Sequence, residues 1–480
     1  MSDQSWLQVL REPVLSETRA NLARSRARVL PQFRTPQQML GRQGNGCGAT
    51  MGAMPRCDFA CRGCYLGDEA NRIPAASVEE VKAQMRALRP LLGNAGNLQL
   101  TDGEVTLRPA EEVIELLQYA TALGLVPMLM THGDTFRRQP GLLERLMVEG
   151  GLREVSIHID TTQRGRRGDR WRAARTEAAL NPLRDEFAAL LRDAARTTGV
   201  TIRGATTMTV TRENLDGVPD VMQWLVRNAD VFRLVSFQPI AQVGRTEDGL
   251  GGGVTVEELW DGIARGLAST DLARAHQWLG HPGCNRFVHG VVATHPDRGS
   301  RYLPVRVQGD GDGPRIVDEF LDRFGGVTFR RDVGVRRWLR ALGLAMHAPR
   351  TTLGNVPAFV RYWLGRLDPG HPWRAARDLF RGRTQLRSLV VVSHHFMSPE
   401  ELETPLGEER LAHCVFHVHA RGETMSMCEA NARGGRTRYY QALRGADARV
   451  PALADQDPGL DPHRRVPGGS ARSRLDAGVV

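Results

Sequence analysis

Between residues 47 and 239 the sequence alternates short apolar stretches with longer amphipathic ones, and this alternation restricts the fold more than any other feature. The short stretches are rich in Val, Leu, Ile, Met or Thr, and the longer ones repeat apolar residues at helical spacing. The predicted strands are 49–54, 97–101, 127–131, 154–160, 201–209 and 231–239, and the predicted helices are 78–92, 110–123, 141–149, 171–197 and 217–228. Six strands with five intervening helices predict a parallel sheet of right-handed crossover units. Ligands bind such sheets at the carboxyl ends of the strands.

With 480 residues the chain has room for one large domain and a smaller one, because a single hydrophobic core rarely exceeds about 250–300 residues. We expect an Arg-rich helical arm over 1–46, the alternating domain over 47–267, a C-terminal extension over 268–446 and a disordered tail over 447–480. The extension contains basic helical stretches at 335–346 and 356–367, a strand at 389–393 and a cysteine-bearing segment at 412–431. We expect this extension to close over the site of the alternating domain.

Composition excludes several classes of protein. No stretch reaches the roughly 20 apolar residues of a membrane span, and the polar start lacks the apolar core of a signal peptide, so we expect a cytoplasmic protein. The net charge of +10 is almost wholly arginine, with Lys82 the single lysine, and the arginines are scattered among acidic residues. The sequence motifs of nucleic-acid binders are missing, and we do not expect nucleic acid as a partner.

Three of the seven cysteines lie within eight residues, Cys57, Cys61 and Cys64, just after the first predicted strand. A reducing compartment disfavours disulfides, which leaves metal ligation or burial. A structural zinc site normally takes four protein ligands, whereas an iron-sulfur cluster held by three thiolates keeps one iron open for another ligand. The spacing therefore favours a cluster that binds and reduces a small molecule, with a zinc knuckle or reduced core cysteines as the alternative.

The segment from Cys57 to Cys64 resembles the CxxxCxxC pattern of the radical S-adenosylmethionine (radical SAM) superfamily, and the resemblance extends over about residues 47–267. It implies an α/β fold, a partial (βα)6 TIM-like barrel with an α+β C-terminal extension. It also implies a 4Fe-4S cluster on the three cysteines, S-adenosyl-L-methionine, a reductant such as flavodoxin or ferredoxin, and a 5′-deoxyadenosyl radical that abstracts hydrogen from an organic substrate. The family usually has an aromatic residue before the last cysteine, where this chain has Gly63, and Tyr65 or Phe59 would have to supply that ring.

Further candidate residues follow the next predicted strands. Asp102-Gly103-Glu104 resembles the Gly-Gly-Glu of the superfamily, with Asp in place of the first Gly, and implies contacts to the cofactor's methionine group. Thr131 ends the third strand and His158 the fourth, so that both are candidates for hydrogen bonds to the cofactor. The alternative for Asp102-Gly103-Glu104 is an ordinary strand-to-helix turn, and beside the cysteines we favour cofactor binding; His158 is as often a structural group at a strand end.

Four cysteines remain, Cys47, Cys284, Cys414 and Cys428. Cys414 and Cys428 flank a predicted strand-turn-strand, and Cys284 lies in a turn just beyond the barrel. Cys284, Cys414 and Cys428 are therefore candidate ligands of a second, auxiliary iron-sulfur cluster, against the alternative of buried free thiols. Cys47 is either a fourth ligand or inert.

The substrate cannot be read from the sequence. Residues 335–350 and 356–383 combine aromatic residues with many arginines, which is typical of an interfacial helix and makes peripheral membrane contact one interpretation, against a solvated helical layer. A lipid alkyl chain and a ribosomal peptide are the two substrate classes that we consider. A non-catalytic iron-sulfur or zinc-binding relative is the alternative to an enzyme.

Overall fold

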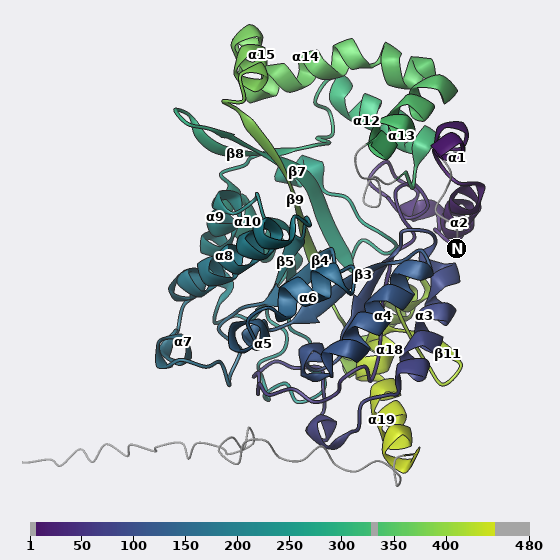
Figure 1. Ribbon diagram of the computed structural model, residues 1–480, viewed down its shortest axis with the longest axis vertical. Coiled ribbons are helices and arrows are strands. Elements are labelled where there is room, and N and C mark those ends of the chain that lie inside the picture. Colours follow the sequence, from purple (N-terminus) through teal and green to yellow (C-terminus); the bar gives the residue numbers. More distant parts are fainter. Residues whose placement is uncertain (1–5, 328–334, 447–480) are drawn as a thin grey trace, which may run out of the picture.

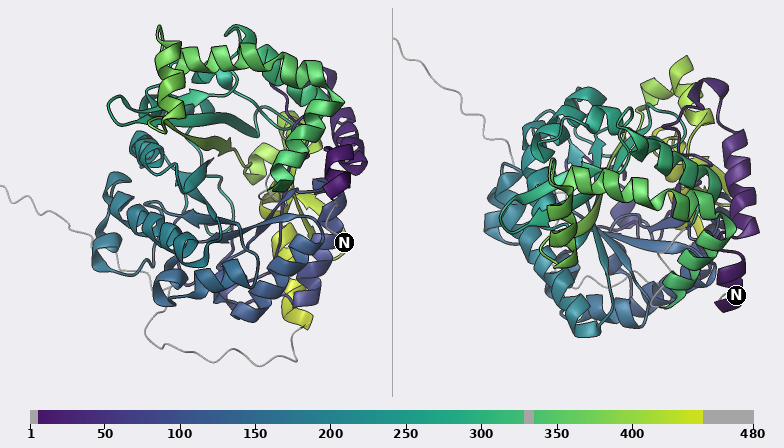
Figure 2. Two further views of the ribbon diagram at one scale, coloured as in Figure 1. Left: turned by 45° about the horizontal axis from the view of Figure 1, so that its top comes forward. Right: turned by 90° about the horizontal axis from the view of Figure 1, so that it is seen from above.

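The computed structural model describes residues 6–327 and 335–446, so the predicted tail at 447–480 lies outside the described residues. Its centre is one curled sheet with strands in the order β11-β10-β1-β2-β3-β4-β5-β6-β9-β7-β8, with helices around its outer side (Figure 1; Figure 2). The strands of the alternating domain are β1 (Cys47–Ala49), β2 (Asn97–Leu100), β3 (Val126–Thr131), β4 (Glu154–His158), β5 (Arg203–Val210) and β6 (Phe232–Pro239). All six run parallel to their neighbours, which confirms the predicted α/β half-barrel.

The helices between these strands cover the outer face of the sheet. They are α3 (Val78–Leu92), α4 (Ala110–Ala122), α5 (Asp134–Arg138), α6 (Leu142–Val148), α7 (Asp169–Ala173), α8 (Asn181–Thr198) and α9 (Val218–Arg227), and α10 (Val256–Leu267) follows β6. Local sequence fixes their ends: the Ser77 hydroxyl accepts a hydrogen bond from the Glu80 amide at the start of α3, and Gly93 ends that helix with φ of 72°. Thr255 and Glu258 form a capping box at the start of α10.

The C-terminal extension adds strands to both edges of this sheet. β9 (Gln385–His394) pairs in parallel with β6, and β10 (Phe416–Ala420) pairs in parallel with β1. β7 (Asn285–His295) and β8 (Gly299–Pro304) continue antiparallel beyond β9, and β11 (Glu423–Ser426) forms a hairpin with β10. The extension is therefore α+β, as predicted, and it widens the parallel sheet at both ends.

The helices of the extension and the N-terminal arm lie outside the sheet. The arm is α1 (Trp6–Arg11) and α2 (Ser16–Ala27). The extension contains α11 (Leu272–Ala275), α12 (Asp312–Phe324), α13 (Val335–His347), α14 (Val356–Leu367), α15 (Pro372–Phe380), α16 (Pro399–Leu402), α17 (Pro405–Ala412), α18 (Met427–Ala432) and α19 (Gly435–Ala446). Helices α13 to α15 lie at one end of the molecule and α18 and α19 at the other (Figure 1).

Two predicted boundaries are wrong. The stretch 171–197 is not one helix but α7 and α8, because Pro182 is unfavourable in a helix interior and instead lies in the first turn of α8. Before it, Ala174 is extended and the carboxylate of Glu177 turns inward to a buried ion pair with Arg184. The first strand is 47–49 rather than 49–54, since the chain after Ala49 leaves the sheet to form the loop that contains the three cysteines.

Candidate active site

One cavity lies at the carboxyl ends of the parallel strands. It is lined by all eight residues predicted for the first cluster and the cofactor: Cys57, Cys61, Cys64, Asp102, Gly103, Glu104, Thr131 and His158. Ser156, Thr207, Thr209 and Gln238 line it from β4, β5 and β6, and the C-terminal extension contributes Phe396, Met397, Phe416, Met427, Cys428 and Asn431. The fold thus gathers residues from the whole chain around the three-cysteine loop.

The three-cysteine loop is held by backbone hydrogen bonds on both sides. Ala60 and Arg62 donate their amides to the carbonyls of Arg164 and Thr162, each at 2.9 Å, and the Arg245 amide donates to Cys64 at 3.0 Å. Burial raises the pKa of Cys57 well above its usual value and that of Cys61 to about 12. These sulfurs therefore hold their protons at neutral pH in the metal-free protein, and a metal that binds them must displace those protons.

Arg245 was not predicted from the sequence, and it has the features expected beside a bound anionic group. Arg245 lines the cavity. Burial lowers the pKa of its guanidinium, but the neighbouring Cys64, Cys57 and Cys61 outweigh burial, so the net effect is a raised pKa. Its Nη2 donates to the Phe59 carbonyl at 3.2 Å, its buried Nε and Nη1 make no hydrogen bond of ordinary geometry among the described residues, and the guanidinium interacts with the Cys64 side chain. Three thiols that face an incompletely paired guanidinium fit an iron-sulfur cluster held by thiolates, since the cation offsets the negative charge of the sulfurs. The only sequence signal for Arg245 is its place in the loop after the sixth strand.

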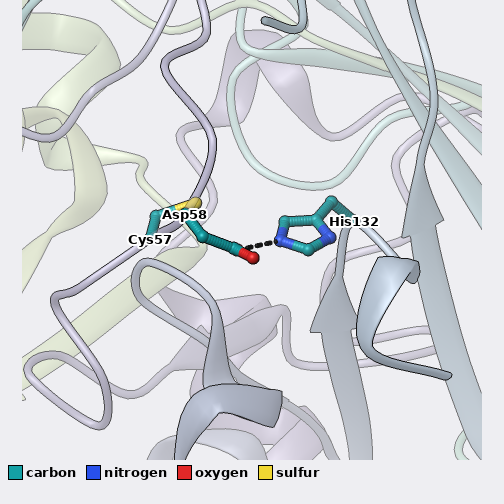
Figure 3. A group of neighbouring side chains, drawn as sticks. All are labelled: Cys57, Asp58 and His132. Atoms are coloured by element: carbon teal, nitrogen blue, oxygen red, sulfur yellow. Dashed lines mark hydrogen bonds and ion pairs between the residues drawn. The ribbon is translucent and has the colours of Figure 1, made fainter. Parts of the chain in front are cut away.

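Cys57, Asp58 and His132 are the one group of His, Cys and acidic side chains in the described part of the chain whose candidate ligand atoms all lie within 4.8 Å of one another (Figure 3). The His132 Nε2 and the Asp58 Oδ1 are 2.7 Å apart, and Arg138 donates to the other Asp58 oxygen at 3.0 Å. The Phe59 ring stacks on the His132 ring with centroids 3.8 Å apart. Because Asp58 and His132 already satisfy each other, they connect the three-cysteine loop to the end of β3 without a metal.

Gly103 occupies the closest approach between the loop after β2 and the three-cysteine loop. A Cβ atom there would overlap the carbonyls of Pro55, Arg56 and Met54. The Gly103 amide donates to Met54 at 2.7 Å, and the Glu104 amide donates to Arg56 at 2.9 Å. Glycine is therefore required at position 103, because any side chain would push the two loops apart.

Glu104 and Thr131 form hydrogen bonds with each other and with the residues that follow β3. The Glu104 carboxylate is buried and accepts hydrogen bonds from the Thr131 hydroxyl at 2.7 Å and the His132 amide at 2.8 Å. The Thr131 hydroxyl in turn accepts one from the Gly133 amide at 2.9 Å. Both residues face the cavity, but their polar groups already have protein partners.

His158 lies at the end of β4 in contact with Asp160. Its Nε2 is 2.5 Å from Asp160 Oδ2, and the Thr209 hydroxyl is 3.3 Å away. Burial raises the pKa of Asp160, but His158, Thr162 and the Thr209 amide outweigh it and lower the pKa to about 2. Asp160 is therefore ionised at neutral pH and fixes the orientation of the His158 ring toward the cavity.

Asp102, which stands where the superfamily has glycine, connects the site to the last helix of the described chain. Its side chain is completely buried and accepts hydrogen bonds from Arg436, from the Tyr440 hydroxyl at 2.7 Å and from the Gly52 amide. The Tyr65 hydroxyl donates to the Asp102 carbonyl at 2.5 Å, and the Arg436 guanidinium lies over the Tyr65 ring at 4.7 Å. We call Asp102, Arg436, Tyr440 and Tyr65 the Asp102–Arg436 network. No sequence motif indicated that α19 takes part in the site.

Gly63 also departs from the superfamily pattern. A Cβ at Gly63 would meet the Cδ1 end of Ile240, which lines the cavity beside it, so a larger residue there requires the Ile240 side chain to move. Phe59 and Tyr65, the two predicted substitutes for the missing ring, both line the cavity as well.

The remaining cysteines lie near one another between β1, β7, β10 and α18. Burial raises the pKa of the Cys414 thiol, with smaller effects in the same direction from Cys428, Cys284 and Cys47. The Cys284 sulfur is 3.5 Å from the Arg410 Nε, and the Cys428 side chain lines the main cavity, which Cys284 and Cys414 do not. Their sulfurs do not converge on a single-ion site within the described residues, so a second cluster stays a prediction.

Comparisons with known proteins agree with this geometry. Residues 51–225 match the family profile described as the radical SAM superfamily. No curated protein matches the sequence. The chain thus contains a radical SAM domain, and the superfamily is one of enzymes.

Solved structures with a local likeness include SuiB of Streptococcus suis bound to S-adenosylmethionine, at 14% identity and a TM-score of 0.34, over 50% of each chain. Others are anSMEcpe with bound AdoMet, at 14% identity and a TM-score of 0.29 over 40% of this chain and 50% of that one, and the methylornithine synthase PylB, at 13% and 0.32 over 55% and 74%. The chain spans half the length of the first of these proteins, and their individual activities are not transferred to it.

Proposed function

We propose that the protein is a radical SAM enzyme that holds a 4Fe-4S cluster on Cys57, Cys61 and Cys64 and uses it to cleave S-adenosyl-L-methionine. The observation that carries the proposal is the common cavity: the three thiols, Gly103, Glu104, Thr131 and His158 all line it inside a domain that matches the superfamily. When bound, the cluster supplies the electron that splits the cofactor's sulfonium into methionine and a 5′-deoxyadenosyl radical, which abstracts hydrogen from the substrate.

The chain's own residues would bind and orient the reactants. Arg245 offsets the negative charge of the thiolates, and Asp160 holds the His158 ring toward the cofactor. The short contact at Gly103 keeps the backbone after β2 against the three-cysteine loop, where its polar groups can meet the methionine end of the cofactor. Thr131 and Glu104 would contribute by keeping the end of β3 in place or by exchanging partners when the cofactor enters.

The cavity residues that come from the C-terminal extension indicate the class of substrate. Phe396, Met397, Phe416 and Met427 present aromatic rings and thioethers to the cavity, and the Phe396 and Phe416 centroids are 6.0 Å apart. Such a wall excludes water and accepts an apolar carbon skeleton, which suits a radical that would otherwise react with any hydrogen donor. A lipid alkyl chain and an apolar side chain of a ribosomal peptide both satisfy this requirement, so both stay as substrate classes. A flavodoxin or ferredoxin would supply the electron.

The proposal also includes a second iron-sulfur cluster on three of the remaining cysteines. Cys284 lies more than a hundred residues before Cys414 and Cys428 in the sequence, yet it is close enough to raise the pKa of both thiols, and this proximity supports the proposal. The competing interpretation is three buried thiols. For the first site, the competing interpretation is a non-catalytic relative that binds zinc through Cys57, Asp58 and His132; the mutual hydrogen bond of Asp58 and His132 argues against it.

The test is anaerobic reconstitution with iron and sulfide, followed by dithionite reduction in the presence of S-adenosylmethionine. We expect about four irons per chain for one cluster or about eight for two, together with 5′-deoxyadenosine. Cys61→Ala should abolish deoxyadenosine formation, while Cys47→Ala should not. Zinc without iron, or full cleavage by the Cys61→Ala protein, would refute the proposal. A stable cluster without deoxyadenosine would favour the non-catalytic relative.

A further inference from the structure

The large hydrophobic side chains that are exposed in the described chain are concentrated in one segment. All except Leu30, Val148 and Leu406 lie between residues 335 and 386, on α13, α14, α15, the short helical turn Arg350–Gly354 and the start of β9. The residues in this segment are Val335, Trp338, Leu342, Met346, Leu353, Val356, Val360, Trp373, Phe380 and Leu386. We call this set the α13–α15 surface.

Each helix presents these side chains on one face. On α13, Trp338, Leu342 and Met346 follow one another at intervals of four, and the opposite side of that helix buries Leu344. On α15, Trp373 and Phe380 are seven residues apart and thus on the same side, with exposed fractions of 87% and 94%. Rings this exposed have little packing among the described residues, and a concentration of such side chains marks an interaction surface.

The charge around these side chains is strongly positive. Residues 335–383 contain ten arginines and two acidic residues, Asp368 and Asp378. Both aspartates are buried and paired, Asp368 with Arg374 and Asp378 with Arg298. Arg350, Arg361 and Arg381 are exposed and have no acidic partner in the part of the chain that the structure describes. A partner that binds the α13–α15 surface must therefore present both apolar groups and negative charge.

We propose that the α13–α15 surface is a docking site for the surface of an anionic lipid bilayer. Trp and Phe side chains enter the boundary between headgroups and acyl chains, and arginines pair with the phosphates above it. The face of α15 combines both, because Arg377 lies between Trp373 and Phe380 on the same side. Contact is peripheral: within the described ranges, no helix is long and apolar enough to cross a bilayer.

The docking site is remote from the reaction cavity. Helix α15 lies just before the start of β9, and the cavity residues Phe396 and Met397 follow its end. Ten residues of strand at about 3.3 Å each separate the two by roughly 30 Å. Figures 1 and 2 show the same arrangement, with α14 and α15 at the end of the molecule away from α19. The surface therefore anchors the enzyme beside a membrane and does not pass a lipid directly into the cavity.

The test is co-sedimentation of the full chain with vesicles of phosphatidylcholine, with and without phosphatidylglycerol, at low and high NaCl. We expect binding to the anionic vesicles that weakens as salt rises. Brominated acyl chains should quench part of the tryptophan fluorescence. Trp373→Ser combined with Phe380→Ser should weaken binding about tenfold or more, because two large apolar side chains are no longer transferred from water. Arg377→Gln with Arg381→Gln should weaken it mainly at low salt.

Matched controls are Val148→Ser and Leu406→Ser, which remove exposed apolar side chains elsewhere and should leave vesicle binding unchanged. The proposal is wrong if anionic vesicles do not bind the protein, if the Trp373/Phe380 double variant binds as well as the wild type, or if the control variants lose binding equally. A concentration-dependent dimer that this double variant abolishes, without vesicle binding by the wild type, would assign the surface to a second copy of the chain instead. None of these outcomes depends on cofactor cleavage.

Discussion

Replacing Arg436 by Met should test how strongly the last helix supports the site. The side chains of Asp102 and Arg436 are 0% and 5% exposed, so the substitution leaves a buried carboxylate without its cation. Removing one partner of such a pair costs about 3–5 kcal/mol, and the Tyr440 hydroxyl and the Gly52 amide that still face Asp102 place the expected value near 3 kcal/mol.

The loss should depend on pH in a defined direction. Burial raises the pKa of Asp102 even in the wild type, against the opposing effects of Arg436 and Tyr440. Without Arg436 that pKa rises further, and a group whose pKa is raised on folding contributes less stability as pH increases through it. The difference between the wild type and Arg436→Met should therefore be largest at neutral pH and shrink toward pH 5.

The assay is urea unfolding of the metal-free proteins, together with the affinity for S-adenosylmethionine after reconstitution. Asp102→Asn combined with Arg436→Met should recover a large part of the lost free energy of unfolding, because no buried charge remains. Arg438→Met is the matched control: Arg438 lies on the same helix, is exposed and donates only to the Arg433 carbonyl. A loss below about 1 kcal/mol for Arg436→Met, or a double variant that is no more stable than the single one, would refute the reasoning.

Three further changes have defined outcomes. Gly103→Ala should lower iron incorporation severalfold, because its Cβ displaces the loop of Cys57, whereas Gly44→Ala, with open space at its Cβ, should not; equal iron content in both proteins would contradict the steric argument. Cys428→Ser should reduce iron from about eight to about four per chain if a second cluster exists, with deoxyadenosine formation retained, and unchanged iron would remove Cys428 from the ligand set. Burial lowers the pKa of His276 to about 3, so this histidine takes up a proton only when the protein unfolds. The free energy of unfolding should therefore fall by about 1 kcal/mol between pH 7 and pH 5.5. His276→Phe should lessen this acid sensitivity in urea titrations at the two pH values, and an unchanged pH dependence would show that His276 is not its source.

Local sequence was sufficient for the half-barrel. Helix α3 and helix α10 begin at cap residues that are visible in the sequence, and several parallel strands are short, mostly apolar runs such as 126–131. The break between α7 and α8 has a local signal that the prediction overlooked, because Pro182 is unfavourable inside a helix and lies in the first turn of α8. The buried pair of Glu177 with Arg184, which holds the turn before α8, is a tertiary contact that the sequence pattern does not show.

The candidate site likewise contains residues that local motifs predict and residues that only tertiary contacts bring in. Motif spacing brought together the cysteines, Gly103 and the strand ends, since each belongs to a strand-to-helix loop of one sheet. Arg245, the pair Phe396 and Phe416, and the Asp102–Arg436 network could not be predicted. Each joins the site through contacts with residues more than a hundred positions away in the sequence, such as the three-cysteine loop or Asp102. The identity of Asp102 was noted as a departure from the superfamily pattern, but only Arg436 and Tyr440 explain it.

The parallel pairing of β1 with β10 joins residue 47 to residue 416. During synthesis on the ribosome, the first strand of the sheet and the neighbouring three-cysteine loop therefore emerge long before the strand that covers their edge. At about 5–20 residues per second the nascent chain spends tens of seconds with an unpaired strand edge and accessible thiols, a state that favours aggregation and oxidation. Nascent chains that stop before α19 also lack Arg436, so the loop around the three cysteines should reach its final form only after α19 has been synthesised.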